Sequence, residues 1–194
     1  MHKTVPVIAL TKCGIGIFDL DWWVPRLGLF KSVTLPSVLQ ASEGYEFHWF
    51  ILLDEDMPTE ALESLRTAID EAGGTDKVHL QFVRTSIEAN RAGLNAVRSV
   101  VGDDQRALAI RIDDDDAVSR EAFTTALDAI DDRGRPAVIS LAEGYIFDAP
   151  GNAYGDWTSP NQTSNTYYYG NLAEIRRVIW HNHTKALFNA KRFG

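Results

Sequence analysis

The run from Phe47 to Leu53 is the sequence feature that most constrains the fold. Its sequence is Phe-His-Trp-Phe-Ile-Leu-Leu, which is apolar on both faces apart from His48. Because successive residues of a strand point to opposite faces, such a run predicts a strand that is covered on both sides. A strand of this kind belongs inside a sheet that carries helices on both faces.

Other strand-like segments alternate with helical patterns along the chain. We expect four further strands, at residues 5–10, 78–82, 107–112 and 137–141. Helices are expected where Pro58 takes the first helical position, after the capping box that Thr85 begins, and after Ser119 as a cap. Short strand–helix alternation predicts an α/β fold with a mostly parallel sheet, in which ligands bind beyond the carboxyl ends of the strands.

Length and composition fit one globular domain covering residues 1–194. The chain is 45% hydrophobic and 24% charged, which argues against intrinsic disorder. Its net charge of −8 makes a nucleic-acid partner a poor expectation, because phosphate contacts need clustered cations. The single cysteine, Cys13, excludes an intrachain disulfide and a four-cysteine zinc site.

The apolar runs are too short for a membrane span. The longest, Trp49 to Leu53, is far below the roughly 18 residues that a transmembrane helix needs. The first residues also show no signal-peptide pattern. We therefore expect no transmembrane segment and a cytoplasmic location.

The pattern changes after about residue 143. Glycine, asparagine, serine, threonine and tyrosine become frequent, and aromatic side chains include Trp157 and the run Tyr167 to Tyr169. We interpret this segment as an elaboration of the same domain. Its aromatic rings would either form a wall that faces a ligand or pack an irregular loop onto the sheet.

Four consecutive carboxylates, Asp113 to Asp116, carry the strongest chemical signal. They directly follow the predicted strand at residues 107–112. Like charges at the mouth of a sheet repel one another, and a divalent cation would relieve that repulsion. Mg²⁺ or Mn²⁺ needs only one or two carboxylates when water and phosphate oxygens complete the octahedron. An acidic helix start is the simpler alternative, although four acids exceed what capping needs.

Two other acidic motifs resemble this run in part. An EF-hand loop beginning at Asp113 would need glycine at Val118 and glutamate at Thr124, so that motif fails. An aspartate-nucleophile phosphatase motif matches at Asp114 and Asp116. That motif normally lies on the first strand, whereas three strand–helix units precede it here, so it stays a minor alternative.

The chain resembles the bacterial rhamnosyltransferase family, among the nucleotide-sugar glycosyltransferases of the GT-A (Rossmann-like) fold. The mid-chain Asp-x-Asp cluster carries the wider resemblance. The other matching residues are Trp22, Trp23, Arg26, Leu29, Phe30, Leu35, Pro36, Ser37, Gln40, Phe47, His48, Trp49, Asp54, Pro58, Arg111, Ile112 and Ala117. This resemblance implies a nucleotide-sugar-binding half, residues 1–118, and an acceptor-side half, residues 119–194. It also implies a nucleoside diphosphate sugar donor and a glycan or sugar acceptor.

The resemblance implies roles for particular residues. Metal, ribose and diphosphate would be held by the run of aspartates, with Asp114, Asp115 and Asp116 as metal ligands and His183 as a late additional one. The nucleotide sugar would contact Thr11, Lys12, Asp54, Asp56, Arg91, Asn95, Arg111, Asp113 and Asp114. A carboxylate must deprotonate the acceptor in an inverting transfer, and the candidates are Glu143, Asp148 and Asp156.

Two readings of the function remain at this point. The first is a transferase that depends on Mn²⁺ or Mg²⁺. The second is a GT-A-like domain that binds a nucleotide or glycan without turnover, or a partial enzyme that needs another chain for its acceptor side. For Asp54, which ends a strand and is not needed to cap the next helix, replacement by alanine is expected to weaken nucleotide binding with little change in melting temperature.

Overall fold

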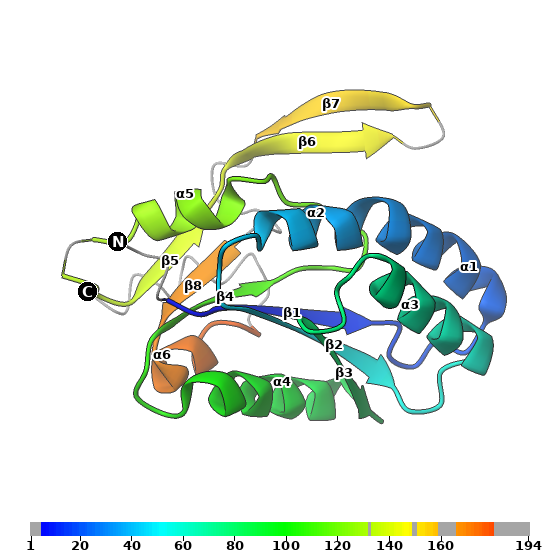
Figure 1. The fold of residues 1–194 in the computed structure, drawn as a ribbon, viewed down its shortest axis with the longest axis horizontal. Helices are drawn as coiled ribbons and strands as arrows, with labels where there is room; N and C mark the ends of the chain where they lie inside the picture. Colours follow the sequence, from blue (N-terminus) through cyan, green and yellow to red (C-terminus); the bar gives the residue numbers. More distant parts are fainter. Residues whose placement is uncertain (1–4, 132, 149–150, 159–165, 181–194) are drawn as a thin grey trace.

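The sheet at the centre of the protein has six strands in the order β3-β2-β1-β4-β8-β5 (Figure 1). The computed structural model describes residues 5–131, 133–148, 151–158 and 166–180. Four neighbouring strands run parallel, namely β1 (Val7–Cys13), β2 (Phe47–Asp54), β3 (Val78–Val83) and β4 (Ala107–Arg111). β2 lies between β1 and β3, and seven of its eight residues are buried. The predicted covered strand and mostly parallel sheet are therefore confirmed.

An antiparallel strand completes the other half of the sheet. β8 (Thr166–Gly170) lies between β4 and β5 (Ala137–Ser140) and runs antiparallel to both. Tyr167 and Tyr168 are buried, on opposite faces of the sheet. The late tyrosines thus belong to a core strand, so neither a ligand-facing wall nor an irregular loop describes them.

Helices cover both faces of the sheet, as Figure 1 shows. One face carries α4 (Ser86–Val101) and the short α6 (Leu172–Arg176), and the other carries α1 (Leu20–Leu29), α2 (Leu35–Ala41), α3 (Thr59–Glu71) and α5 (Ala122–Asp128). The alternation of β1 supplies both cores, because Ile8 packs with the α4 side and Val7 with the other. Among the described helices, none is long and apolar enough to cross a membrane.

The predicted helix starts are correct to different degrees. Thr85 caps α4, where its hydroxyl accepts the N–H of Glu88 at 3.2 Å. Pro58 precedes α3 as its N-cap residue rather than occupying its first turn. The prediction for Ser119 is wrong, since α5 begins only at Ala122. Val118 is buried in the segment between β4 and α5. Ser119 follows it in a turn, where its carbonyl accepts the N–H of Ala122.

A continuous helical segment connects β1 to β2. Between α1 and α2 it widens into one π-helical stretch, η1 (Phe30–Thr34), where the N–H of Leu35 donates to the carbonyl of Phe30. The widened turn comes directly before Pro36, which has no N–H to donate. This segment lies over the carboxyl end of β4 and brings Arg26 and Thr34 to the residues that follow that strand.

A two-stranded hairpin stands apart from the main sheet (Figure 1). Its strands are β6 (Glu143–Asp148) and β7 (Ala153–Thr158), paired antiparallel. Four large apolar or aromatic side chains of this hairpin are exposed: Tyr145, Ile146, Phe147 and Tyr154. The segment predicted as an elaboration of the domain is therefore partly a regular hairpin.

Two histidines face each other across β2 and β3. Nδ1 of His48 lies 3.4 Å from Nε2 of His79, and Oε1 of Glu46 lies 3.8 Å from Nε2 of His48. An N–H···N bond needs one ring nitrogen without a proton, so this contact disfavours two charged rings. Burial first, and then the charge of His48, lower the pKa of His79.

This pair predicts a loss of stability in mild acid. An unfolded histidine titrates near its ordinary pKa of 6.5, above that of folded His79, so the unfolded chain takes up the proton first. The contribution is complete above pH 6.5 and is lost as the pH falls through the lower pKa of the folded protein. Melting temperatures measured between about pH 7 and 5 should therefore fall less steeply for His79→Gln. Equal slopes for variant and wild type would contradict this role.

Candidate functional site

The four aspartates leave the carboxyl end of β4 as a turn. The side chain of Ile112, the first residue after β4, is buried. In the turn that follows, the N–H of Asp116 donates to the carbonyl of Asp113 at 3.2 Å. Successive carboxylates consequently point in different directions. Asp113 is exposed, Asp114 is buried, and Asp115 is exposed again.

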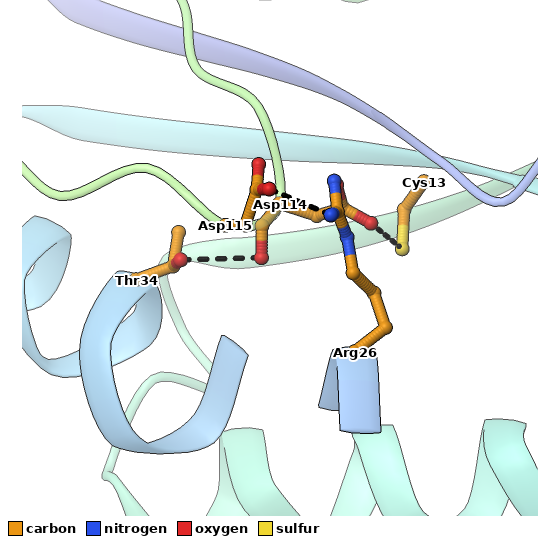
Figure 2. Close-up of polar contacts among 5 residues, drawn as sticks. All are labelled: Cys13, Arg26, Thr34, Asp114 and Asp115. Carbon is orange, nitrogen blue, oxygen red and sulfur yellow. Dashed lines mark hydrogen bonds and ion pairs between the residues drawn. The ribbon is translucent and has the colours of Figure 1, made fainter. Parts of the chain in front are cut away.

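Asp114 is held from several sides (Figure 2). One carboxylate oxygen accepts from Nη2 of Arg26 at 2.6 Å, and the other accepts from the Cys13 thiol at 3.0 Å. Its backbone carbonyl accepts from the hydroxyl of Thr34 at 3.2 Å. Asp114 is only 4% exposed. A phosphatase nucleophile needs a free oxygen facing its substrate, so this arrangement argues against the phosphatase alternative.

Arg26 also binds Asp115, whose Oδ2 lies 2.6 Å from Nη1. Arg26 therefore compensates the charges of Asp114 and Asp115 without a metal, contrary to the expectation from the sequence. Burial tends to lower the pKa of Arg26, but the hydrogen bond and charge of Asp114 and the charge of Asp115 raise it overall. Arg26 was among the residues of the family resemblance, yet nothing in the sequence indicated its partners.

Cys13 acts here as a neutral hydrogen-bond donor. Burial, followed by the charge and hydrogen bond of Asp114, raises the pKa of its thiol far above the ordinary value. A thiol in that state is a poor nucleophile, because the thiolate is the reactive form. Its role is to help fix the carboxylate of Asp114.

A groove of about 790 Å³ lies between the acidic turn and the β6–β7 hairpin. Its volume falls in the range of small-molecule sites. Four acidic residues are among those that line it, namely Asp115, Asp116, Glu143 and Asp148. Its remaining lining is Leu29, Val33, Ala117, Val118, Ser119, Ala122, Leu141, Gly144, Tyr145, Ile146, Phe147 and Trp157.

This groove distinguishes the candidate bases. Glu143 and Asp148 lie at the two ends of β6 and line the groove together with the acidic turn. Asp156 pairs with Tyr145 in the hairpin and is not among the described residues that line the groove. The hairpin pairing thus joins two of the three candidates to the aspartates, although they are more than twenty residues apart in sequence.

The acidic turn suits a cation that is held by few protein ligands. Within the described parts of the chain, no three side chains of His, Cys, Asp or Glu are grouped closely enough to enclose a metal ion. Asp115 and Asp116 nevertheless line one groove, and Mg²⁺ or Mn²⁺ accepts one or two carboxylates with water and phosphate oxygens. His183, the expected late ligand, lies outside the described residues.

Positive charge gathers on the other face of the same strand ends. Nζ of Lys12 donates to the hydroxyl of Ser86 at 3.1 Å and lies 4.6 Å from the ring centre of Trp180. Burial, and then the charge of Arg111, lower the pKa of Lys12. Thr11 is fully buried, and its hydroxyl accepts from Nε1 of Trp49 at 2.9 Å. Of these predicted nucleotide contacts, Lys12 and Arg111 are half-buried while Thr11 packs inside.

Asp54 organises the chain around it. Its Oδ2 accepts the N–H of Gly16 at 2.8 Å, and its Oδ1 accepts the N–H of Asp56 at 3.0 Å. It is only 2% exposed, whereas Asp56 is exposed. Asp54 does not cap α3, as expected, but its two backbone hydrogen bonds give it a role in the loops after β1 and β2 that the sequence did not indicate.

Arg91 and Asn95 are exposed on α4 and lie outside the lining of the groove. Between them, Gly93 lies under Trp180, whose ring would be 2.5 Å from an added Cβ. Nε1 of Trp180 donates to the carbonyl of Asn90 at 3.0 Å. This part of α4 thus supports the tryptophan beside Lys12.

The fold and the groove define an α/β protein with an acidic site at the carboxyl edge of its sheet, where such sheets bind ligands. The chain belongs to the family described as "Putative rhamnosyl transferase", which matches residues 15–189. This confirms the resemblance seen in the sequence. A comparison with curated proteins gives no match.

One solved structure is similar over most of its length. It is the crystal structure of 4-diphosphocytidyl-2C-methyl-D-erythritol synthase, with 11% sequence identity and a TM-score of 0.46. The similarity covers 95% of this chain and 84% of that protein.

Proposed function

We propose that the protein is a glycosyltransferase that moves a sugar from a nucleoside diphosphate sugar to a hydroxyl of a sugar or glycan acceptor. Its membership of a rhamnosyl transferase family supports rhamnose as the sugar. The observation that carries the proposal is the groove, which joins the acidic turn after β4 to two carboxylates of the hairpin.

The groove and the cations on the other face of the strand ends have different tasks in this reaction. Asp115 and Asp116 would hold Mn²⁺ or Mg²⁺, which when bound supplies positive charge for the departing nucleoside diphosphate. Lys12 and Arg111, across the strand ends, offer cations to the donor's phosphates. The bulky rings of Tyr145 and Trp157 provide apolar surface for packing sugars.

Residues of the hairpin are the candidates for the base that deprotonates the acceptor. A general base must lie within hydrogen-bonding reach of the attacking hydroxyl, which removes Asp156 from consideration if the acceptor occupies the groove. Glu143 and Asp148 remain, and either carboxylate can take the proton as the acceptor oxygen attacks the anomeric carbon. The leaving nucleoside diphosphate keeps the bonding electrons.

Donor hydrolysis tests this proposal directly. Wild-type protein incubated with uridine, guanosine and thymidine diphosphate sugars, including a rhamnosyl donor, should slowly release nucleoside diphosphate from one of them when Mn²⁺ is present. Asp116→Asn should reduce that release by about tenfold or more, on the scale of a lost charged interaction. Asp128→Asn, an equal change of charge at an exposed position of α5, serves as the matched control.

The outcomes separate the two readings of the function. Binding of a nucleotide sugar in a thermal-shift assay without any release would indicate a domain that binds without turnover. Release that is equally fast in Asp116→Asn and without Mn²⁺ would remove the cation from the reaction. If the protein neither binds nor hydrolyses any nucleotide sugar of the panel, the transferase is rejected.

A further inference from the structure

Arg26 binds carboxylates that a cation at the acidic turn would also bind. Its guanidinium bridges Asp114 and Asp115 with one nitrogen on each, both at 2.6 Å, as Figure 2 shows. Its third nitrogen, Nε, is buried and has no hydrogen-bond partner among the described residues. Within the described part of the chain, the hydrogen bonds of Arg26 go to these two carboxylates.

The two bonds differ in how accessible they are. The side chain of Asp114 is 5% exposed and also accepts from the thiol of Cys13, while its backbone carbonyl accepts from the hydroxyl of Thr34. The side chain of Asp115 is 38% exposed and lines the groove beside Asp116. A cation that arrives from the groove thus meets the bond to Asp115 first and leaves the bond to Asp114 in place.

Charge decides what happens at Asp115. Arg26 carries one positive charge and the two carboxylates that it binds carry two negative charges, so this group stays negative after Arg26 has bound. A divalent cation is attracted to the remaining charge but repelled by the guanidinium beside it. Contact between Arg26 and the ring of Trp22, whose centre is 5.6 Å from Cζ, keeps the guanidinium close.

We propose that Arg26 is a built-in counter-ion that competes with the divalent cation for Asp115. Without the cation it holds Asp115 against the helical segment, and the cation releases the Nη1 arm while Nη2 stays on Asp114. The released arm is then a free N–H donor beside the groove, of the kind that binds phosphate oxygens. This inference rests on the cation site of the proposed function.

The test is a titration of the metal-free protein with Mn²⁺ alone, with free Mn²⁺ measured by electron paramagnetic resonance. Arg26→Gln should bind Mn²⁺ about fivefold more tightly or better, because removing a unit charge near a divalent ion has an effect of that order. Arg98→Gln, which removes an exposed charge on α4, should match wild type. Asp115→Asn should weaken binding.

A second measurement avoids any loss of folding in the variant. In wild type, Mg²⁺ should shift the guanidinium resonance of Arg26, assigned by its absence in Arg26→Lys. Equal or weaker Mn²⁺ affinity in Arg26→Gln, or an unmoved resonance at saturating Mg²⁺, overturns the inference. If wild type binds neither ion, the inference and the cation site fail together. The nucleoside diphosphate release assay then still judges the transferase separately.

Discussion

Replacement of Asp114 by alanine is expected to lower the melting temperature by about 4–12 °C, with a loss of roughly 2–3 kcal/mol in the free energy of unfolding. The change leaves the thiol of Cys13 and one arm of Arg26 without their acceptor in a site where Asp114 is 4% exposed. Breaking a fully buried ion pair costs more, but the side chain of Arg26 is 27% exposed and water can reach it. Thermal or urea unfolding followed by circular dichroism measures the loss.

Asp113→Ala is the matched control from the same turn. Asp113 is exposed, so its replacement should change the free energy of unfolding by less than about 0.5 kcal/mol. Crowded carboxylates repel one another in a metal-free protein, and on that argument alone the replacement of Asp114 would be equally harmless. Equal melting temperatures for the two variants would restore that argument and would show that the pairing with Arg26 contributes nothing.

Asp54→Ala is expected to lower stability by a similar amount, about 2–3 kcal/mol, because a charged acceptor of two backbone N–H groups is lost. The N–H of Gly16 lies in the loop after β1, and the N–H of Asp56 lies in the turn after β2. Both N–H groups would lose their acceptor, at a position where Asp54 is only 2% exposed. The melting temperature should fall by about 4–12 °C in a protein of this size.

Asp56→Ala tests whether the negative charge of the turn after β2 matters as such. Asp56 is exposed and contributes its N–H, which alanine keeps, so this variant should melt like wild type. The affinity of Asp54→Ala for nucleoside diphosphate, measured on the same sample, gives the second readout. Unchanged affinity would assign Asp54 to the loop alone and remove it from the nucleotide site, while unchanged stability would contradict its role in the loop.

Much of the fold was predictable because it depends on local patterns. The run at Phe47 to Leu53 indicated a covered strand, and the structure places β2 inside the sheet. Thr85 and Glu88 marked the start of α4, since a capping hydroxyl reaches only a few residues along the chain. β8 was missed, because a strand of tyrosines between glycine- and asparagine-rich segments has no periodicity that distinguishes it from a loop.

The candidate site was likewise predictable only where it depends on local patterns. By itself, the sequence determined that four carboxylates follow a buried strand, and this places them at the carboxyl edge of the sheet. Only the tertiary structure decided their partners, such as Arg26, which lies 88 residues from Asp114. It also decided that Asp54 supports Gly16 and that Glu143 shares a groove with Asp116. The physical reason is that patterns of burial are set by neighbours in sequence, whereas charged contacts depend on strand order and on the path of the connecting helices.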